Sequence, residues 1–175
     1  MLVTSGVPQG SVLGPLLFII YNCDIDQHIQ HSFLSSFTDD TCVLREISDT
    51  SDAELLQEDL ETLYQWADRN NMMFNDSKFE HMQYTVKGCS NSSPKYTAND
   101  GSQICIKQEV RDLGVTLSCD GNFTSHITKV TIKARSQAGW VLRTFCTRKP
   151  EPMLTLYKTM VVPLLEYCCQ LWSPW

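Results

Sequence analysis

The spacing of apolar positions predicts amphipathic helices and short strands along this 175-residue chain. From Ser51 to about Asn70 the apolar residues recur at helical spacing, and Ser51-Asp52-Ala53-Glu54 has the form of a capping box. Another helix is expected to begin near Ser125 and to end at Pro150. Residues 11–30 are expected to be partly helical, with the apolar run of residues 12–21 forming a buried helix.

Between these helices lie patterns that are typical of antiparallel strands. The acidic pair Asp39-Asp40 separates two apolar runs, which predicts a hairpin over about residues 33–45 with the acids at its tip. Further strands are expected over residues 79–86, 96–106 and 112–117, with a turn at Asn99-Asp100-Gly101-Ser102. Hairpins combined with flanking helices place the chain in the α+β class.

Charge is segregated along the chain, whose net charge is −6. Residues 46–80 carry ten acidic side chains and two basic ones. Residues 121–149 contain no acid and carry six bases, which are Lys129, Lys133, Arg135, Arg143, Arg148 and Lys149. Such a basic stripe is typical of a surface that contacts a phosphate backbone, although a solvated helix face has the same composition.

The eight cysteines are scattered, with no Cys-x-x-Cys pair and no Cys/His set at zinc spacing. They are therefore expected to be reduced thiols of an intracellular protein. The opening residues lack the basic and long apolar segments of a signal peptide, which argues against secretion. The apolar run of residues 12–21 is too short to span a bilayer, so no membrane partner is expected.

Asp39 and Asp40 are the first candidates for chemistry. Strand alternation sends neighbouring side chains in different directions, so the two carboxylates are expected to present charge at a site rather than to pair. An Asp-Asp turn is also ordinary solvated turn sequence. The local pattern leaves both interpretations open.

A second block lies upstream and runs Ser5-Gly6-Val7-Pro8-Gln9-Gly10-Ser11-Val12-Leu13-Gly14-Pro15-Leu16-Leu17-Phe18. Together with Phe37-Thr38-Asp39-Asp40, this block resembles the reverse transcriptases, and in particular the non-LTR, LINE-type retrotransposon branch. The resemblance continues through residues 66–78 and through residues 110–115, which are similar to the strand pair called the primer grip. Residues 142–145 and 157–174 resemble the thumb of these elements.

The resemblance implies a fold and a function. Residues 1–118 would form a partial palm, of antiparallel strands with flanking helices and the primer-grip strands, and residues 119–175 a mainly helical thumb with a C-terminal extension. The implied activity is RNA-directed DNA synthesis by two-metal nucleotidyl transfer, with two Mg²⁺ ions as cofactors. The implied partners are an RNA template, a DNA primer, deoxynucleotides and the upstream palm and fingers segment of the same polyprotein.

The same resemblance gives roles to individual residues. Asp39 and Asp40 are the implied metal ligands, and Lys78 matches a lysine proposed to protonate pyrophosphate, so all three are candidate catalytic residues. The residues expected to contact template, primer or nucleotide are Gly6, Gln9, Gly10, Phe37, Arg111, Gly114, Lys129, Lys133 and Arg135.

The chain also departs from the family. The family site has a third carboxylate on an earlier palm strand, and no residue of this chain matches it. We therefore expect a palm and thumb fragment that is inactive alone. Thr38 stands where the family more often has alanine. The alternative is a non-catalytic retroelement remnant that binds nucleic acid or protein, and polymerases related to telomerase or intron maturases form a third option.

Overall fold

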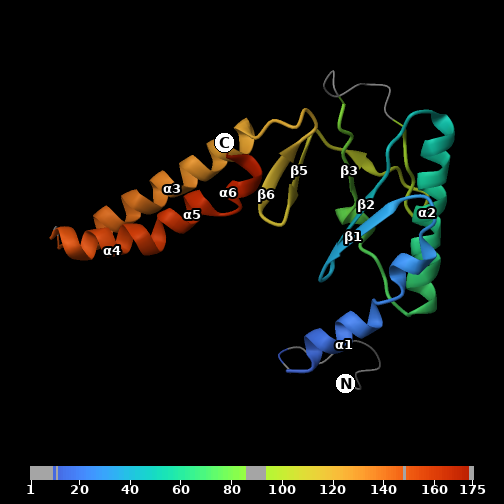
Figure 1. Cartoon of the computed structure of the whole chain (residues 1–175), viewed down its shortest axis with the longest axis horizontal. Helices are drawn as coiled ribbons and strands as arrows, with labels where there is room; N and C mark the ends of the chain where they lie inside the picture. The colour runs from blue at the N-terminus through green and yellow to red at the C-terminus, as the bar shows by residue number, and fades with distance from the viewer. Residues whose placement is uncertain (1–9, 11, 86–93, 148, 174–175) are drawn as a thin grey trace. The chain divides into compact units, whose positions relative to one another are not determined.

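The computed structural model describes residues 10, 12–85, 94–147 and 149–173 (Figure 1). The chain folds as two compact units. The described residues up to His81 and from Pro94 to Cys105 belong to the first unit, and the remaining described residues belong to the second. A division after residue 118 into palm and thumb stays a prediction.

The first unit contains a strand hairpin and one long helix. Its helical elements are α1 (Gly14–Tyr21), η1 (Ile25–His28), α2 (Thr50–Arg69) and η2 (Asp76–Lys78). The hairpin is formed by β1 (Phe33–Phe37) and β2 (Asp40–Leu44), which confirms the prediction over residues 33–45. Two further short strands, β3 (Glu80–His81) and β4 (Cys105–Ile106), pair with each other.

The N-terminal cap of α2 differs from the predicted one. Asp49 precedes the helix in an extended conformation, and its side chain accepts a hydrogen bond from the backbone N–H of Asp52 at 3.0 Å. Asp52 in turn accepts a hydrogen bond from the backbone N–H of Asp49 at 3.3 Å. The box predicted at Ser51 is therefore wrong, because the helix begins two residues earlier, with Asp49 at N-cap and Asp52 at N3 forming the box instead.

The core of the first unit lies on one face of α2. Its buried residues are Ile25, Leu60, Leu63, Tyr64, Trp66, Ala67, Tyr96, Ala98 and Ile104. Leu34 of β1 and Val43 of β2 pack against this cluster and are partly buried. Helix α2 is therefore the support on which the β1–β2 hairpin rests.

Helix α1 contradicts the prediction of a buried helix. None of its residues is buried, and Leu16, Ile19 and Ile20 are 53%, 64% and 57% exposed. At its C-terminal end, Tyr21 donates a hydrogen bond to the carbonyl of Asn70, and its ring lies 6.5 Å from that of Trp66. The prediction failed because an apolar pattern indicates that a helix needs a packing partner, but does not indicate which segment packs against it.

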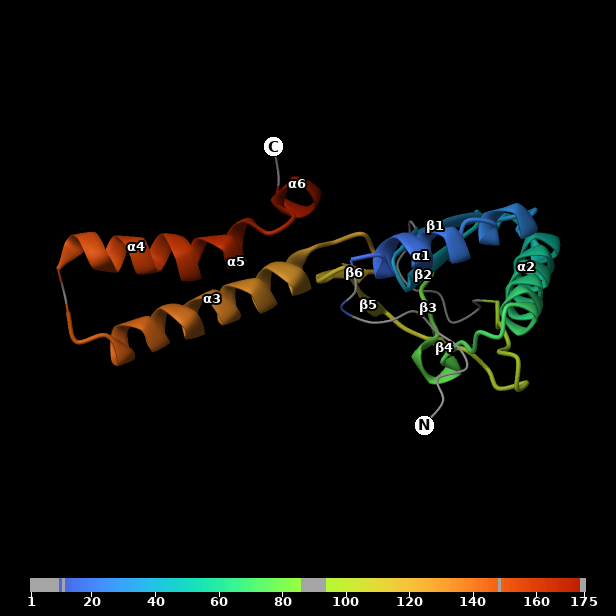
Figure 2. The same ribbon diagram turned by 90° about the horizontal axis from the view of Figure 1, so that it is seen from below.

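The second unit consists of a hairpin and packed helices. The strands β5 (Glu109–Asp112) and β6 (Val115–Ser118) are antiparallel. The helices are α3 (Thr124–Thr144), α4 (Pro150–Met160), α5 (Val162–Glu166) and α6 (Cys169–Trp172). Figures 1 and 2 both show α4 and α5 running back along α3. Ala134, Val141 and Val161 are buried in this unit.

Three boundaries differ from the sequence predictions. The strand expected over residues 79–86 is reduced to β3 in its described part. The strand expected over residues 112–117 is a hairpin instead, because Leu113 and Gly114 form a turn with φ of +44° and +88°. Pro150 begins α4, since its fixed φ suits the first position of a helix. The mixture of helices and short antiparallel strands agrees with the predicted α+β class.

Two further predictions, on the cysteines and on membrane-spanning segments, can be compared with the structure. Cys119 is disulfide-bonded, so the expectation of reduced thiols throughout is wrong at this position. That expectation came from spacing along the chain, which does not detect cysteines brought together by folding. None of the helices in the described part of the chain combines the length and apolar character needed to cross a bilayer.

Candidate functional site

The tip of the β1–β2 hairpin carries both candidate carboxylates. Phe37 pairs with Asp40 across the strands, so Thr38 and Asp39 form a two-residue turn (Figure 1). Asp40 is the first residue of β2, and both acids are exposed. Thr38 has φ of +56°, in the left-handed region that a β-branched residue rarely adopts. The turn is therefore strained at the residue that precedes the acids.

The environment of Asp39 favours its ionised form. The hydroxyl of Thr38 donates a hydrogen bond to Oδ1 of Asp39 at 2.9 Å. This hydrogen bond, together with the backbone N–H of Asp39 and the attraction of the Lys78 ammonium, lowers the pKa of Asp39 below its ordinary value. Of the other predicted catalytic residues, Lys78 is near enough for its charge to contribute to this lowering.

We predict that Thr38→Gly stabilises the hairpin by about 0.5–1 kcal/mol, because glycine adopts positive φ without the steric cost of a side chain. The same change removes the hydroxyl from Asp39, so the pKa of Asp39 should rise. Thr38→Ala is the matched control, since it removes the hydroxyl and keeps a side chain at positive φ. Chemical unfolding and an NMR titration of Asp39 separate the two effects. Equal stability of the glycine and alanine variants would contradict the strain argument.

The base of the hairpin is held by a buried carboxylate. Asp59 of α2 is 2% exposed. Its Oδ1 accepts a hydrogen bond from the backbone N–H of Gln30, and its Oδ2 accepts one from the backbone N–H of His31, both at 3.1 Å. Gln30 and His31 lie just before β1, so Asp59 fixes the point where the chain enters the hairpin.

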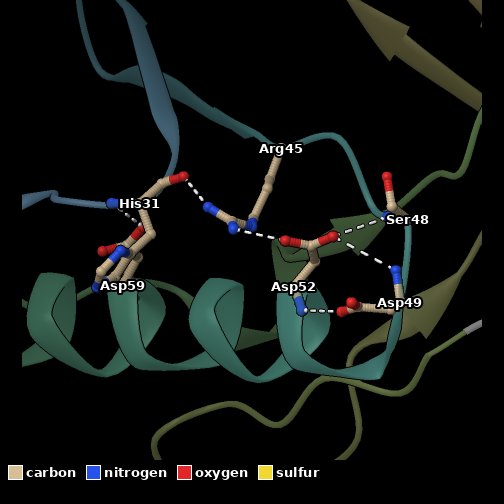
Figure 3. A network of polar contacts seen from close by, with 6 residues as sticks. All are labelled: His31, Arg45, Ser48, Asp49, Asp52 and Asp59. Carbon is tan, nitrogen blue, oxygen red and sulfur yellow. Dashed lines mark hydrogen bonds and ion pairs between the residues drawn. The ribbon is translucent and has the colours of Figure 1, made fainter.

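The point where the chain leaves the hairpin is held by Arg45, the residue after β2 (Figure 3). Its guanidinium donates to the carbonyl of His31 and forms an ion pair with Asp52 at 2.7 Å. Asp52 also accepts from the backbone N–H of Ser48 at 2.9 Å. The Ser48 hydrogen bond and the Arg45 contact lower the pKa of Asp52. Both ends of the hairpin are thus anchored on α2, which orients its tip.

Sequence reasoning missed this role of Asp59 and counted it only among the ten acids of residues 46–80. A signal was present, however. Asp59, Leu63 and Trp66 are spaced i, i+4 and i+7, so the carboxylate shares a helix face with apolar side chains. An acid on an apolar face indicates a buried partner.

The remaining predicted site residues within residues 1–81 are Gly6, Gln9, Gly10 and Phe37. Phe37 is 62% exposed on β1, so the tip presents an aromatic ring beside the acids. Gly10 is exposed with φ of +79°. Gly6 and Gln9 lie outside the described residues.

In the second unit, Arg111 is exposed on β5, and Gly114 forms the β5–β6 turn. Lys129 forms an ion pair with Glu109 at 2.8 Å. Lys133 and Arg135 are exposed on α3. The structure therefore places these residues on one hairpin and one helix, and gives Lys129 an acidic partner that the basic stripe did not predict.

The chemistry of the β1–β2 tip is that of a partial cation site. Adjacent exposed carboxylates are the oxygen ligands that hard divalent cations prefer, so Asp39 and Asp40 fit Mg²⁺ as members of a ligand set. Within the described ranges, no group of three or more His, Cys, Asp or Glu side chains is arranged to hold a metal ion. The tip supplies two carboxylates and needs further ligands from elsewhere.

The chain matches the model of the family described as reverse transcriptase (RNA-dependent DNA polymerase) over residues 2–117. The match covers more than half of the chain. The chain belongs to the reverse transcriptase family, as the resemblance in its sequence indicated.

Curated relatives indicate the branch of the family to which the chain is similar. A probable RNA-directed DNA polymerase from transposon X-element of Drosophila melanogaster is 31% identical over 179 residues, which cover 98% of this chain and 19% of that protein. The RNA-directed DNA polymerase from mobile element jockey of Drosophila funebris is 30% identical over 186 residues, which cover 98% of this chain and 20% of that protein. The chain thus spans about a fifth of the length of these relatives. They support the LINE-type branch, and no solved structure gives a significant match.

Proposed function

We propose that this chain contributes the carboxylate hairpin and the primer-holding part of an RNA-directed DNA polymerase from a LINE-type element. The observation that carries the proposal is the position of Asp39 and Asp40, exposed at the tip of a hairpin whose two ends are anchored on α2. Such anchoring favours catalysis that depends on charges held in fixed positions. Family membership gives the reaction class, since the chain's own residues give only part of the site.

Asp39 and Asp40 would hold part of the coordination sphere of Mg²⁺. When bound, two such ions activate the primer hydroxyl and stabilise the leaving oxygen of an in-line displacement. The charge of Lys78 acts on Asp39, which supports the proposal that Lys78 serves as a proton donor near this tip. Phe37, exposed beside the acids, offers an apolar face to the end of a primer.

The purified chain is expected to give no Mg²⁺-dependent extension of a DNA primer on an RNA template, because two carboxylates leave each hard cation short of ligands. Weak cation binding should still occur at the tip. Mn²⁺, used as a paramagnetic probe, should broaden the amide signals of residues 38–41, and Asp40→Asn should abolish the broadening. Asp26→Asn, at an exposed acid of η1, is the control. Extension that is lost in Asp39→Ala would contradict the inactivity and retain the metal role, whereas equal broadening in Asp40→Asn would contradict the proposed site.

The second unit supports the nucleic-acid part of the proposal. Lys129 and Lys133 are four residues apart on α3 and therefore lie on one face of the helix. Charges of this kind bind phosphates by releasing counterions, so their affinity falls as the salt concentration rises. Arg111 on β5 belongs to the same unit, which would act as primer grip and thumb.

Charge reversal on α3 tests this surface. We expect Lys133→Glu with Arg135→Glu to weaken binding of an RNA–DNA duplex about tenfold or more and to reduce the salt slope by roughly one to two. Lys129→Glu should weaken binding less, because Glu109 already pairs with Lys129. Lys158→Glu on α4 is the matched control. Fluorescence anisotropy at several salt concentrations measures these effects, and unchanged slopes in the double variant would exclude α3 as a phosphate-binding helix.

The exposed apolar surface of α1 supports one further partner. A helix that leaves Leu16, Ile19 and Ile20 more than half exposed is typical of an interface. The relatives are about five times as long as the matched region. The partner we propose is the palm and fingers segment of the same polyprotein. The carboxylate set of the described residues, which lacks a third member, also fits a second candidate function, a non-catalytic nucleic-acid-binding remnant. Such a remnant should bind the duplex but show no Mn²⁺ broadening of residues 38–41.

A further inference from the structure

The β5–β6 turn is covered by a tyrosine that lies 54 residues away in the sequence. The hydroxyl of Tyr167 donates a hydrogen bond to the carbonyl of Leu113 at 2.7 Å. The ring covers the next residue, because a side-chain carbon added to Gly114 would lie 3.2 Å from the ring. The segment that follows α5 therefore holds the tip of this hairpin.

The same segment also reaches the strand β6 through two further side chains. The indole N–H of Trp172 donates to the carbonyl of Tyr167 at 2.9 Å. The Trp172 ring lies 5.5 Å from the ring of His126, which is 3% exposed near the start of α3. Nδ1 of His126 accepts a hydrogen bond from the backbone N–H of Thr116 at 3.1 Å. Thr116 belongs to β6, so the contacts return to the hairpin from which they began.

These contacts form a closed path through the second unit. It runs from the Leu113 carbonyl to Tyr167, then to Trp172, His126 and the N–H of Thr116. A two-stranded hairpin is marginally stable unless it packs against other elements. The path supplies such packing at the tip through Tyr167, and at the second strand through His126, against whose ring Trp172 packs.

We propose that Tyr167 is a positioning residue for the β5–β6 hairpin, holding its turn in the orientation in which the hairpin contacts the end of a primer duplex. The inference rests on the proposed function of this hairpin. It adds a role for a residue outside the carboxylate site and outside the basic face of α3. Tyr167 acts through Leu113 and Gly114, not by contact with the reacting atoms.

The first test removes only the hydroxyl. Tyr167→Phe keeps the ring over Gly114, so the unit should still fold, with a midpoint of thermal unfolding lowered by about 2–8 °C, the shift expected for the loss of one hydrogen bond. Amide hydrogen exchange of residues 109–118 should accelerate about 3–10-fold, because the local hold on the turn is lost. Tyr157→Phe, at an exposed tyrosine of α4, is the control. Unchanged exchange in Tyr167→Phe would overturn the proposal.

The second test asks whether the hold serves nucleic-acid binding. An RNA template annealed to a fluorescent DNA primer should dissociate from Tyr167→Phe about 3–10-fold faster than from wild type, with little change in salt slope, since no phosphate contact is removed. If wild type binds and Tyr167→Phe dissociates at the same rate, the positioning role is wrong and the proposed function stands. If wild type itself does not bind the duplex, the proposed function of the second unit fails and takes the positioning role with it.

A third variant tests the ring contact independently of the hydroxyl. Gly114 and Gly121 both have positive φ, of +88° and +70°, but a side-chain carbon added to Gly121 meets nothing within 4 Å. Both Gly114→Ala and Gly121→Ala therefore introduce backbone strain. Only Gly114→Ala also brings a side chain against the ring of Tyr167. Gly114→Ala should accelerate exchange of the hairpin several-fold more than Gly121→Ala, and Tyr167→Ala should remove this excess. Equal effects of the two glycine variants would contradict the ring contact.

Discussion

Asp59→Ala is expected to lower the free energy of unfolding of the first unit by about 2–4 kcal/mol, because it leaves two backbone donors without an acceptor. The donors are the N–H groups of Gln30 and His31, each 3.1 Å from a carboxylate oxygen of Asp59. Asp59 is 2% exposed, so water replaces the lost acceptors poorly. Urea unfolding followed by circular dichroism measures the loss.

The effect on the hairpin is the more informative part of this experiment. Without Asp59 the entry of the chain into β1 is free to move, so amide exchange of residues 33–44 should rise more than exchange of α2. Glu58→Ala is the control, since Glu58 is the exposed neighbour on the same helix. Asp59→Asn keeps one acceptor oxygen and should lose less stability than Asp59→Ala. A loss below about 0.5 kcal/mol in Asp59→Ala, the range of ordinary surface changes, would show that Asp59 does not anchor the hairpin.

His126→Ala is expected to destabilise the second unit by about 2–4 kcal/mol at pH 7. The imidazole is 3% exposed, and its removal leaves the buried N–H of Thr116 without an acceptor. It also removes the ring contact with Trp172. His126→Asn places an amide oxygen near the position of Nδ1 and should recover part of the stability. Equal loss in the alanine and asparagine variants would contradict the role of Nδ1 as the acceptor.

The same residue makes stability depend on pH. Burial and the nearby Lys129 ammonium lower the pKa of His126 below its ordinary value of 6.5. Glu109 of β5 pairs with this Lys129 ammonium. The unfolded chain therefore binds a proton more readily than the folded chain, so stability is complete above pH 6.5 and is lost as the pH falls toward the folded-state pKa.

Unfolding measured at pH 7.5, 6.5 and 5.5 should show this loss in wild type. The loss should be smaller in His126→Asn, which has no group that titrates in this range. Burial also lowers the pKa of His81 in the first unit, so a weaker dependence remains in the variant. A slope of the same size in wild type and His126→Asn would show that His126 is not the group responsible.

Local patterns in the sequence predicted the elements that depend on residues close together in the chain. The β1–β2 hairpin follows from apolar runs on either side of Asp39-Asp40, and α2 follows from its apolar spacing, although its cap lies at Asp49 and not at the predicted Ser51. The register Phe37 to Asp40, which places one acid in the turn and the other on a strand, needs only the length of the turn. Family motifs supplied the roles that geometry alone leaves open.

Features that depend on contacts between distant segments were not predictable. The burial of Asp59 depends on the backbone of Gln30 and His31, which only folding brings to α2. The cover over Gly114 depends on Tyr167, more than fifty residues away. The exposure of α1 was missed for a related reason, because periodicity describes the helix and not its surroundings. Lys129 looked like a free phosphate ligand until β5 placed Glu109 beside it.

The strained turn at Thr38 has a consequence for how this sequence would respond to selection for stability. Replacing Thr38 by glycine relieves the positive φ, so libraries screened only for folding or expression should enrich glycine there. Such clones would also lose the hydroxyl that donates to Asp39. Oδ1 of Asp39 would then lack the contact that holds it in the turn. A thermostable descendant obtained in this way would carry a less firmly oriented carboxylate at the tip, which makes position 38 one to keep fixed in engineering.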